Sequence, residues 1–211
     1  MKRRTVLHEL VAAAVAAAAP VAILNVVGVA TANAQSASRS GNAPRIRTRY
    51  LRPPGALAEA QFTAQCIRCG QCGAVCPNRC IRFFDSSNGV DSIDTPYIVP
   101  REQACILCMK CGEVCPSGAI QAIARKAGDI LAKVKMGQAR VDESLCLSYQ
   151  GKTCGVCYRA CPLPDVALTV GHLEQPKVFA ACVGCGLCER SCIQLPQAIR
   201  VFPATSTEPR V

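Results

Sequence analysis

The chain has 211 residues, of which 17 are cysteine, 15 glycine and 14 proline, and only 4% are aromatic. This composition excludes a disordered chain and a polytopic membrane protein, and argues against an enzyme with a broad aromatic-lined pocket. The formal net charge of +10 would suit nucleic acid, while the cysteine content is typical of a disulfide scaffold or a metalloprotein.

The first 34 residues have the layout of an export signal. They contain a basic start (Lys2-Arg3-Arg4), an apolar stretch from Leu10 to Ala30 and the small-residue sequence Ala32-Asn33-Ala34. The adjacent arginines resemble a twin-arginine signal, which exports proteins already folded. A Sec signal or an uncleaved membrane anchor is an alternative, because about 20 apolar residues can span a bilayer.

Residues 35–65 are predicted to form a basic linker. A turn is expected at Pro53-Pro54-Gly55 and a short helix over residues 56–65. The linker's positive charges form either a solvated arm or a docking surface for an acidic partner or lipid headgroups. They belong to Arg39, Arg45, Arg47, Arg49 and Arg52.

Four copies of one cysteine pattern follow. Three have the spacing Cys-x2-Cys-x2-Cys-x3-Cys, and the third copy has seven residues in its first gap. The copies are Cys66, Cys69, Cys72 and Cys76; Cys105, Cys108, Cys111 and Cys115; Cys146, Cys154, Cys157 and Cys161; Cys182, Cys185, Cys188 and Cys192. Proline follows the last cysteine in three copies, at Pro77, Pro116 and Pro162, and Ile193 replaces it in the fourth.

This spacing is typical of [4Fe-4S] cluster ligation in bacterial ferredoxins. Zinc sites usually pair two Cys-x2-Cys knuckles across a longer gap, and disulfides, although common in exported proteins, are poorly served by such closely spaced loop cysteines. With about −2 added per oxidised cluster, four clusters would bring the loaded protein close to neutral. We therefore expect four [4Fe-4S] clusters and no nucleic-acid partner.

The fourth cysteine of each motif is expected to ligate the other cluster of a pair. Motifs one and two resemble each other after their last cysteine, as do motifs three and four, which defines two pairs. The predicted ligand sets are Cys66, Cys69, Cys72 and Cys115; Cys105, Cys108, Cys111 and Cys76; Cys146, Cys154, Cys157 and Cys192; Cys182, Cys185, Cys188 and Cys161. Cys80 is left over and is interpreted as a small buried residue beside a cluster, with a fifth-ligand or redox-sensor role as the alternative.

The predicted fold is α+β, with tandem bacterial-type 2[4Fe-4S] ferredoxin-like units at residues 66–120 and 142–202. Residues 121–141 are predicted to connect them through a helix from Ile123 to Val134 and a strand from Gln138 to Val141. Residues 203–211 form a tail. Other short strands are expected at Ile98-Val99, Leu168–Val170 and Ile199–Phe202, and His172 is interpreted as an exposed strand residue.

Two stretches resemble the MauM/NapG ferredoxin-type family. They are Leu51–Ala56 with Cys66–Cys72, and Cys146–Cys161 with its Tyr149-Gln150-Gly151 insertion. The resemblance implies twin-arginine export. NapG-like members pass electrons from a membrane quinol-oxidising partner toward periplasmic nitrate reductase, and MauM-like members are linked to methylamine utilisation. The plain gap before Cys111 and the early end of the chain favour the MauM branch.

The sequence lacks a Walker loop, a Rossmann fingerprint and a nucleophile–base pair, so no catalytic residues are predicted. The expected function is electron transfer between a membrane-bound, quinol-linked donor and a periplasmic oxidoreductase. Two alternatives remain: an accessory protein that helps mature a periplasmic dehydrogenase such as methylamine dehydrogenase, and an electron-transfer subunit of a molybdopterin oxidoreductase. The expected location is the periplasm, with membrane association through a partner or a retained signal anchor.

Overall fold

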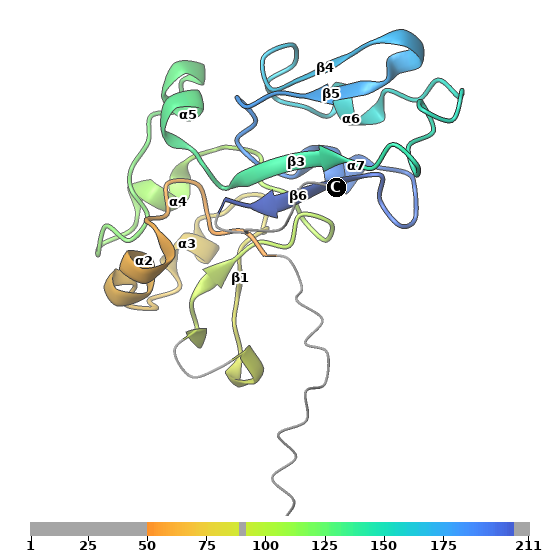
Figure 1. Ribbon diagram of the computed structural model, residues 1–211. Helices are drawn as coiled ribbons and strands as arrows, with labels where there is room; N and C mark the ends of the chain where they lie inside the picture. Colours follow the sequence, from red (N-terminus) through yellow and green to blue (C-terminus); the bar gives the residue numbers. More distant parts are fainter. Residues whose placement is uncertain (1–49, 89–91, 205–211) are drawn as a thin grey trace, which may run out of the picture. The chain divides into compact units, whose positions relative to one another are not determined.

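The computed structural model describes residues 50–88 and 92–204 (Figure 1). Residue contacts divide the chain into Met1–Ile46 and Arg47–Val211, and every described residue belongs to the second of these units. The export signal, the arginines from Arg39 to Arg49 and most of the predicted tail lie outside the described residues. Within the described part, no helix has the length and apolar character needed to cross a membrane.

The first half of this unit consists of short elements around the first two cysteine motifs. Its β1–β2 hairpin is antiparallel, with Arg82 opposite Tyr97. The elements are α2 (Glu59–Gln65), α3 (Gln71–Ala74), β1 (Arg82–Phe83), the 3-10 helix η1 (Ser86–Asn88), β2 (Pro96–Tyr97) and α4 (Lys110–Glu113).

The second half begins with α5 and carries the longest strand pair. β3 and β6 pair antiparallel, with Ala139 opposite Val201, and β4 pairs antiparallel with β5. The elements are α5 (Ala127–Lys133), β3 (Gly137–Val141), α6 (Val156–Arg159), β4 (Leu168–Val170), the 3-10 helix η3 (His172–Glu174), β5 (Pro176–Val178), α7 (Leu187–Ser191) and β6 (Ile199–Pro203).

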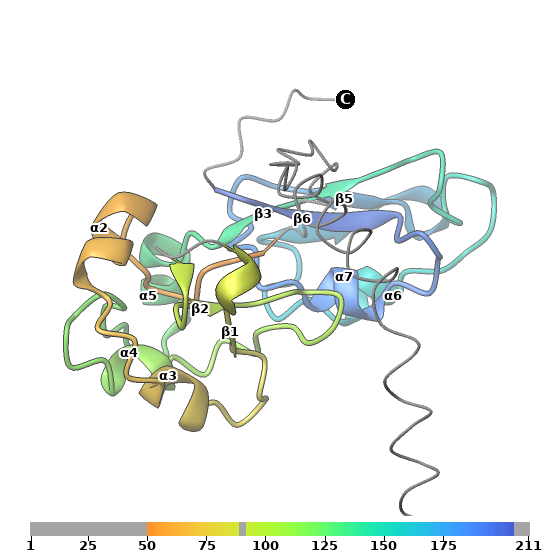
Figure 2. The same ribbon diagram turned by 90° about the horizontal axis from the view of Figure 1, so that it is seen from below.

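The two halves repeat one arrangement. Each has a hairpin between its two motifs, and each packs its two motif helices together, α3 with α4 and α6 with α7. In each, the segment that precedes the first motif pairs antiparallel with the segment that follows the second. This pairing is a single bridge between Ala56 and Ile120 in the first half and the β3–β6 ladder in the second. In Figure 2, α3 and α4 of the first half lie beside each other, as do α6 and α7 of the second.

Most of the predicted elements are present, with two corrections. The helix after Ile123, the strand near Gln138 and the strands at Leu168 and Ile199 are found as α5, β3, β4 and β6. The strand expected at Ile98-Val99 is found two residues earlier, at Pro96 and Tyr97, which pair with β1. Ile98 instead forms an isolated antiparallel bridge with Leu51, and the two backbones exchange hydrogen bonds of 2.8 Å. His172 is exposed as expected, but it lies in η3 because β4 ends at Val170.

Arg52 is part of the packed structure and does not belong to a docking arm. Its guanidinium forms an ion pair with Glu59 and donates to the Pro96 carbonyl at 2.7 Å. The same group lies 4.6 Å from the centre of the Phe62 ring, which is fully buried. Its side chain is only 10% exposed. The hypothesis of an arginine docking surface is therefore wrong for Arg52.

Candidate metal centres

The backbone explains why three of the four motifs share one spacing. In each, the residues immediately before and after the second cysteine have positive φ angles, so the chain curls tightly around that cysteine. The pairs are Arg68 (60°) and Gly70 (73°), Leu107 (53°) and Met109 (62°), and Gly184 (76°) and Gly186 (85°). Such turns direct backbone N–H groups into a concavity that suits an anion. Each curl leads directly into the short helix that carries the third cysteine.

The third motif has a different loop between its first and second cysteines. Its seven-residue gap forms a turn of its own, in which the Cys146 carbonyl accepts hydrogen bonds from the Tyr149 and Gln150 N–H groups at 3.1 Å. The positive φ angle after the second cysteine is kept, at Gly155 (56°). Arg159 then forms an ion pair with Glu174 at 2.7 Å and donates to the Cys154 carbonyl. These two contacts of Arg159 fix the end of the seven-residue loop at Cys154.

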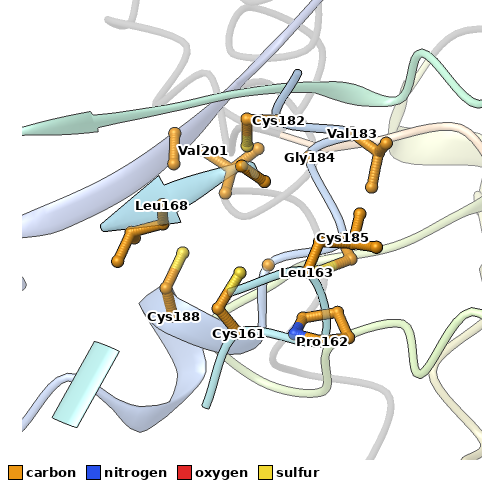
Figure 3. Close-up of a pocket in the computed structure, with 13 residues that line it drawn as sticks. Cys161, Pro162, Leu163, Leu168, Cys182, Val183, Gly184, Cys185, Cys188 and Val201 are labelled. Atoms are coloured by element: carbon orange, nitrogen blue, oxygen red, sulfur yellow. The ribbon is translucent and has the colours of Figure 1, made fainter. Parts of the chain in front are cut away.

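The structure brings the four cysteines of the fourth predicted ligand set around one apolar pocket (Figure 3). Three come from the fourth motif, and Cys161 comes from the third motif, as cross-ligation requires. Figure 3 also shows Leu163, Leu168, Val183 and Val201 at this pocket, together with Cys161, Cys182, Cys185 and Cys188. Four cysteines around an apolar cavity are the donor set that a [4Fe-4S] cluster needs. The residues at this site therefore fit such a cluster.

The cysteines of the other predicted sets are brought together less completely. Burial is the main reason that the pKa of Cys72 is raised to about 11, and the neighbouring Cys66, Cys69 and Cys115 raise it further. Cys66, Cys69 and Cys115 therefore each lie in the neighbourhood of Cys72. In the second set, the pKa of Cys111 is raised to about 12 by burial and by the neighbouring Cys105, Cys108 and Cys72.

Two predicted ligands are less closely placed. Cys76 approaches the second set through Cys80, whose Sγ lies 3.6 Å from the Cys76 Sγ and which also hydrogen-bonds Cys105. In the third set, burial and the neighbouring Cys146 and Cys154 raise the pKa of Cys157 to about 11. Cys192 and Cys157 both pack against the same core cluster.

The raised pKa values mean that cluster binding must displace protons. Burial raises the pKa of Cys185 to about 12 from an ordinary 9.0, and raises that of Cys188 well above 9.0. These thiols are therefore neutral near pH 7 in the metal-free chain, whereas ligation needs thiolates. Cys115 differs, because hydrogen bonds from the Ile120 N–H and from Ser117 outweigh its burial and lower its pKa.

Three residues that support the motifs were not predicted from the sequence. Glu189 is a buried carboxylate on α7 that accepts a hydrogen bond from the Val201 N–H at 2.6 Å, and so fixes α7 to β6. Arg101 binds the end of α7, and Ser148 lies buried in the third motif. No motif marks any of them, since each acts through contacts between segments far apart in the sequence.

Comparison with known proteins defines the class. A family model described as a 4Fe-4S dicluster domain matches residues 65–119, which hold the first two motifs. The chain is thus a ferredoxin-type iron–sulfur protein.

Three relatives then identify the family. The chain is 38% identical over 195 residues to the ferredoxin-type protein NapG of Escherichia coli, covering 85% of this chain and 79% of that protein. It is 35% identical over 171 residues to the methylamine utilization ferredoxin-type protein MauM of Methylorubrum extorquens, covering 77% and 76%. The NapG protein of Haemophilus influenzae is 40% identical over 166 residues, which make up 72% of this chain and 58% of that protein. The chain therefore belongs to the MauM/NapG ferredoxin-type family.

Both branches of this family are equally close, so the comparisons do not support the preference for MauM drawn from the sequence.

Proposed function

We propose that the chain is an electron carrier with four [4Fe-4S] clusters, which passes electrons between a membrane-bound, quinol-linked donor and a periplasmic oxidoreductase. A bound cluster supplies a one-electron redox centre. The observation that carries the proposal is the pocket where Cys161 of the third motif joins Cys182, Cys185 and Cys188 of the fourth. It supports the exchange of ligands between motifs on which the four-cluster assignment rests.

In this function the protein's own residues hold the clusters and exclude water from them. The motif loops provide thiolates, and their curled backbones direct N–H groups inward, which stabilises negative charge on a bound group. Buried aliphatic residues such as Leu168 and Val201 exclude water from the fourth site. This environment suits electron transfer, which needs little rearrangement and no substrate pocket.

The choice of partners follows from the family. NapG and MauM relatives are both named as ferredoxin-type proteins, and MauM is named for methylamine utilization. We propose a membrane ferredoxin-type quinol dehydrogenase as donor, with delivery to the periplasm in folded form by the twin-arginine route. Membrane association would come from that partner or from a retained signal anchor.

The test is electron transfer by anaerobically purified protein. We expect it to accept electrons from dithionite, to pass them to an acceptor protein and to convert no small-molecule substrate alone. Substrate oxidation by the isolated chain would overturn the carrier function. Full clusters with no transfer to any periplasmic oxidoreductase, but defective dehydrogenase maturation in a deletion strain, would favour the accessory role.

Export is tested separately. Replacing Arg3 and Arg4 by lysine should leave the folded precursor in the cytoplasm, because the twin-arginine pair is what this route reads. Cell fractionation measures the outcome, and unchanged periplasmic delivery would indicate the Sec route.

A further inference from the structure

The two halves of the described unit meet at their cysteine motifs. The Cys105 N–H donates a 3.0 Å hydrogen bond to the Cys185 carbonyl, which joins the second motif directly to the fourth. Both cysteines are buried, and Leu107 and Val183 beside them belong to one hydrophobic core cluster that spans both halves. The ligand loops of the second and fourth motifs are therefore in backbone contact.

Arg101 fastens this contact from the first half. Its Nη1 donates to the carbonyls of Glu189, Arg190 and Cys192 at 3.3, 3.1 and 2.9 Å, at the end of α7. Arg190 donates back to the Arg101 carbonyl at 3.3 Å. A cation at a helix C-terminus satisfies carbonyls that the helix itself leaves free.

The packing at the same place leaves no room for a side chain. A Cβ added at Gly186, directly after Cys185, would lie 2.5 Å from the Cβ of Pro100. Pro100 and Arg101 precede the second motif, and Gly186 is the N-cap residue of α7. The junction is thus built from side-chain, backbone and steric contacts, which join the fourth motif to the second motif and to the segment that leads into it.

Contacts within each half connect the remaining motifs to this junction. Cys72 of the first motif and Cys111 of the second lie in one core cluster. In the second half, α6 packs against α7, and Cys157 on α6 is among the neighbours that raise the pKa of Cys188 on α7. Contact therefore runs from the first motif to the second, then to the fourth, then to the third.

We propose that the second and fourth ligand sets are neighbouring sites across this junction, with Arg101 as its positioning residue. The four sites then follow the order first, second, fourth, third, which differs from their order in the sequence. The first and third sites are the two ends, where electrons enter from or leave to other proteins. This inference rests on the proposed four-cluster function.

Two ligand-deletion variants test the order. One replaces Cys66, Cys69, Cys146 and Cys154 by alanine, which leaves the second and fourth sites. Its matched counterpart replaces Cys105, Cys108, Cys182 and Cys185, which leaves the first and third. Each should retain about eight irons. After dithionite reduction, electron paramagnetic resonance should show spin–spin broadening in the first variant and independent signals in the second. The reverse pattern, or independent signals in both, would overturn the proposed order.

A second measurement uses the chain with all its cysteines, in case the deletions prevent folding. Arg101→Ala should raise hydrogen exchange of residues 186–192 and of the Cys105 amide about tenfold, the factor expected for loss of one hydrogen bond. The exposed Arg125→Ala is the control. Iron content should remain full, while coupling between the halves weakens. Unchanged hydrogen exchange and unchanged spin coupling between the halves would show that Arg101 does not position the junction. Failure to bind iron in the unmutated chain would instead refute the proposed function.

An independent observation concerns the third site. Ser148 lies within the wide gap between Cys146 and Cys154 and is 1% exposed. Its Oγ is buried and has no hydrogen-bond partner among the described residues. A buried hydroxyl without a partner is unfavourable, so this residue fits a site in which a bound group supplies the acceptor.

We propose that the Ser148 hydroxyl donates a hydrogen bond to a sulfur atom of the group held by the third ligand set. Donors near cluster sulfurs stabilise the reduced, more negative state and raise the reduction potential. Redox-titrated electron paramagnetic resonance should show that Ser148→Ala lowers the midpoint of one cluster, with iron content unchanged. The exposed Ser144→Ala should shift none. Four unaltered midpoints in Ser148→Ala would refute the assignment.

Discussion

At the scale of single residues, Arg52 shows how a surface-type side chain can become structural. It bridges α2 and β2 by bonding Glu59 and the Pro96 carbonyl, and it covers the Phe62 ring. Its sequence context, a run of arginines near a proline pair, gave no sign of this. The structural role of Arg52 comes from its contacts with Glu59 and Pro96, which its local sequence does not encode.

Arg52→Ala should lower the free energy of unfolding by about 1–3 kcal/mol, because it leaves the Pro96 carbonyl without a charged donor and opens the cover of Phe62. The partner Glu59 is 42% exposed, so its carboxylate can be rehydrated, which limits the loss. The midpoint of urea unfolding measures the effect, with Arg125→Ala as the control. Equal midpoints for the two variants would contradict a structural role.

Variants of Cys80 and Cys115 distinguish a cysteine that only lies beside a cluster from one that ligates it. Cys80→Ala should keep full iron, since Cys80 is an additional buried thiol and the corresponding position, Ala119, is already alanine. Cys115→Ala should lose about four irons, from the set that contains Cys72 rather than from its own motif. Iron analysis with electron paramagnetic resonance distinguishes these results. Equal iron loss in both variants would refute cross-ligation and the neighbour role of Cys80 together.

At the scale of elements, Gly112 is required by how closely α4 approaches the chain after the second motif. A Cβ at Gly112 would lie 2.3 Å from the Gln121 carbonyl oxygen and 2.9 Å from its carbon. These are backbone atoms that cannot rotate away. The glycine therefore permits the contact that seats α4 against the segment ending the first half.

Gly112→Ala should destabilise the protein by about 1–3 kcal/mol through overpacking. Gly128, within α5, has no atom within 4 Å of an added Cβ, so Gly128→Ala should stabilise by about 0.5–1 kcal/mol through helix propensity. Urea unfolding of both variants gives the comparison. A Gly112→Ala protein as stable as the unmutated one would show that α4 can shift without cost.

The elements also show what the sequence can predict. The helical spacing after Ile123 was sufficient for α5 (Ala127–Lys133), and the strands expected near Gln138 and Ile199 are found as β3 and β6. Ile98 has the same strand-like character, but its backbone pairs with Leu51, which lies 47 positions earlier. Cysteine spacing predicted the composition of the fourth pocket, whereas Arg101, Glu189 and Ser148 depend on tertiary contacts that spacing does not encode.

At the scale of the whole molecule, the arginines before the described part bear on docking. Arg45, Arg47 and Arg49 lie outside the described residues, so their role stays a prediction. Clustered positive charge speeds the encounter with an acidic surface, and salt screens that attraction. Electron transfer to a partner should therefore slow as ionic strength rises.

Replacing Arg45, Arg47 and Arg49 by glutamine should slow transfer at low salt and flatten its salt dependence. Arg125→Gln, an exposed charge elsewhere, serves as the control for net charge. Stopped-flow kinetics across a salt series provides the readout. If the transfer rate changes neither with salt nor with these substitutions, the segment from Arg45 to Arg49 acts only as a tether.

The central claim is that sixteen motif cysteines hold four [4Fe-4S] clusters, and iron and acid-labile sulfide analysis of anaerobically purified protein tests it most directly. We predict about sixteen irons and about sixteen sulfides per chain, with reduction by dithionite producing interacting electron paramagnetic resonance signals. A content of about four metals that include zinc, or disulfides without iron, would contradict the account.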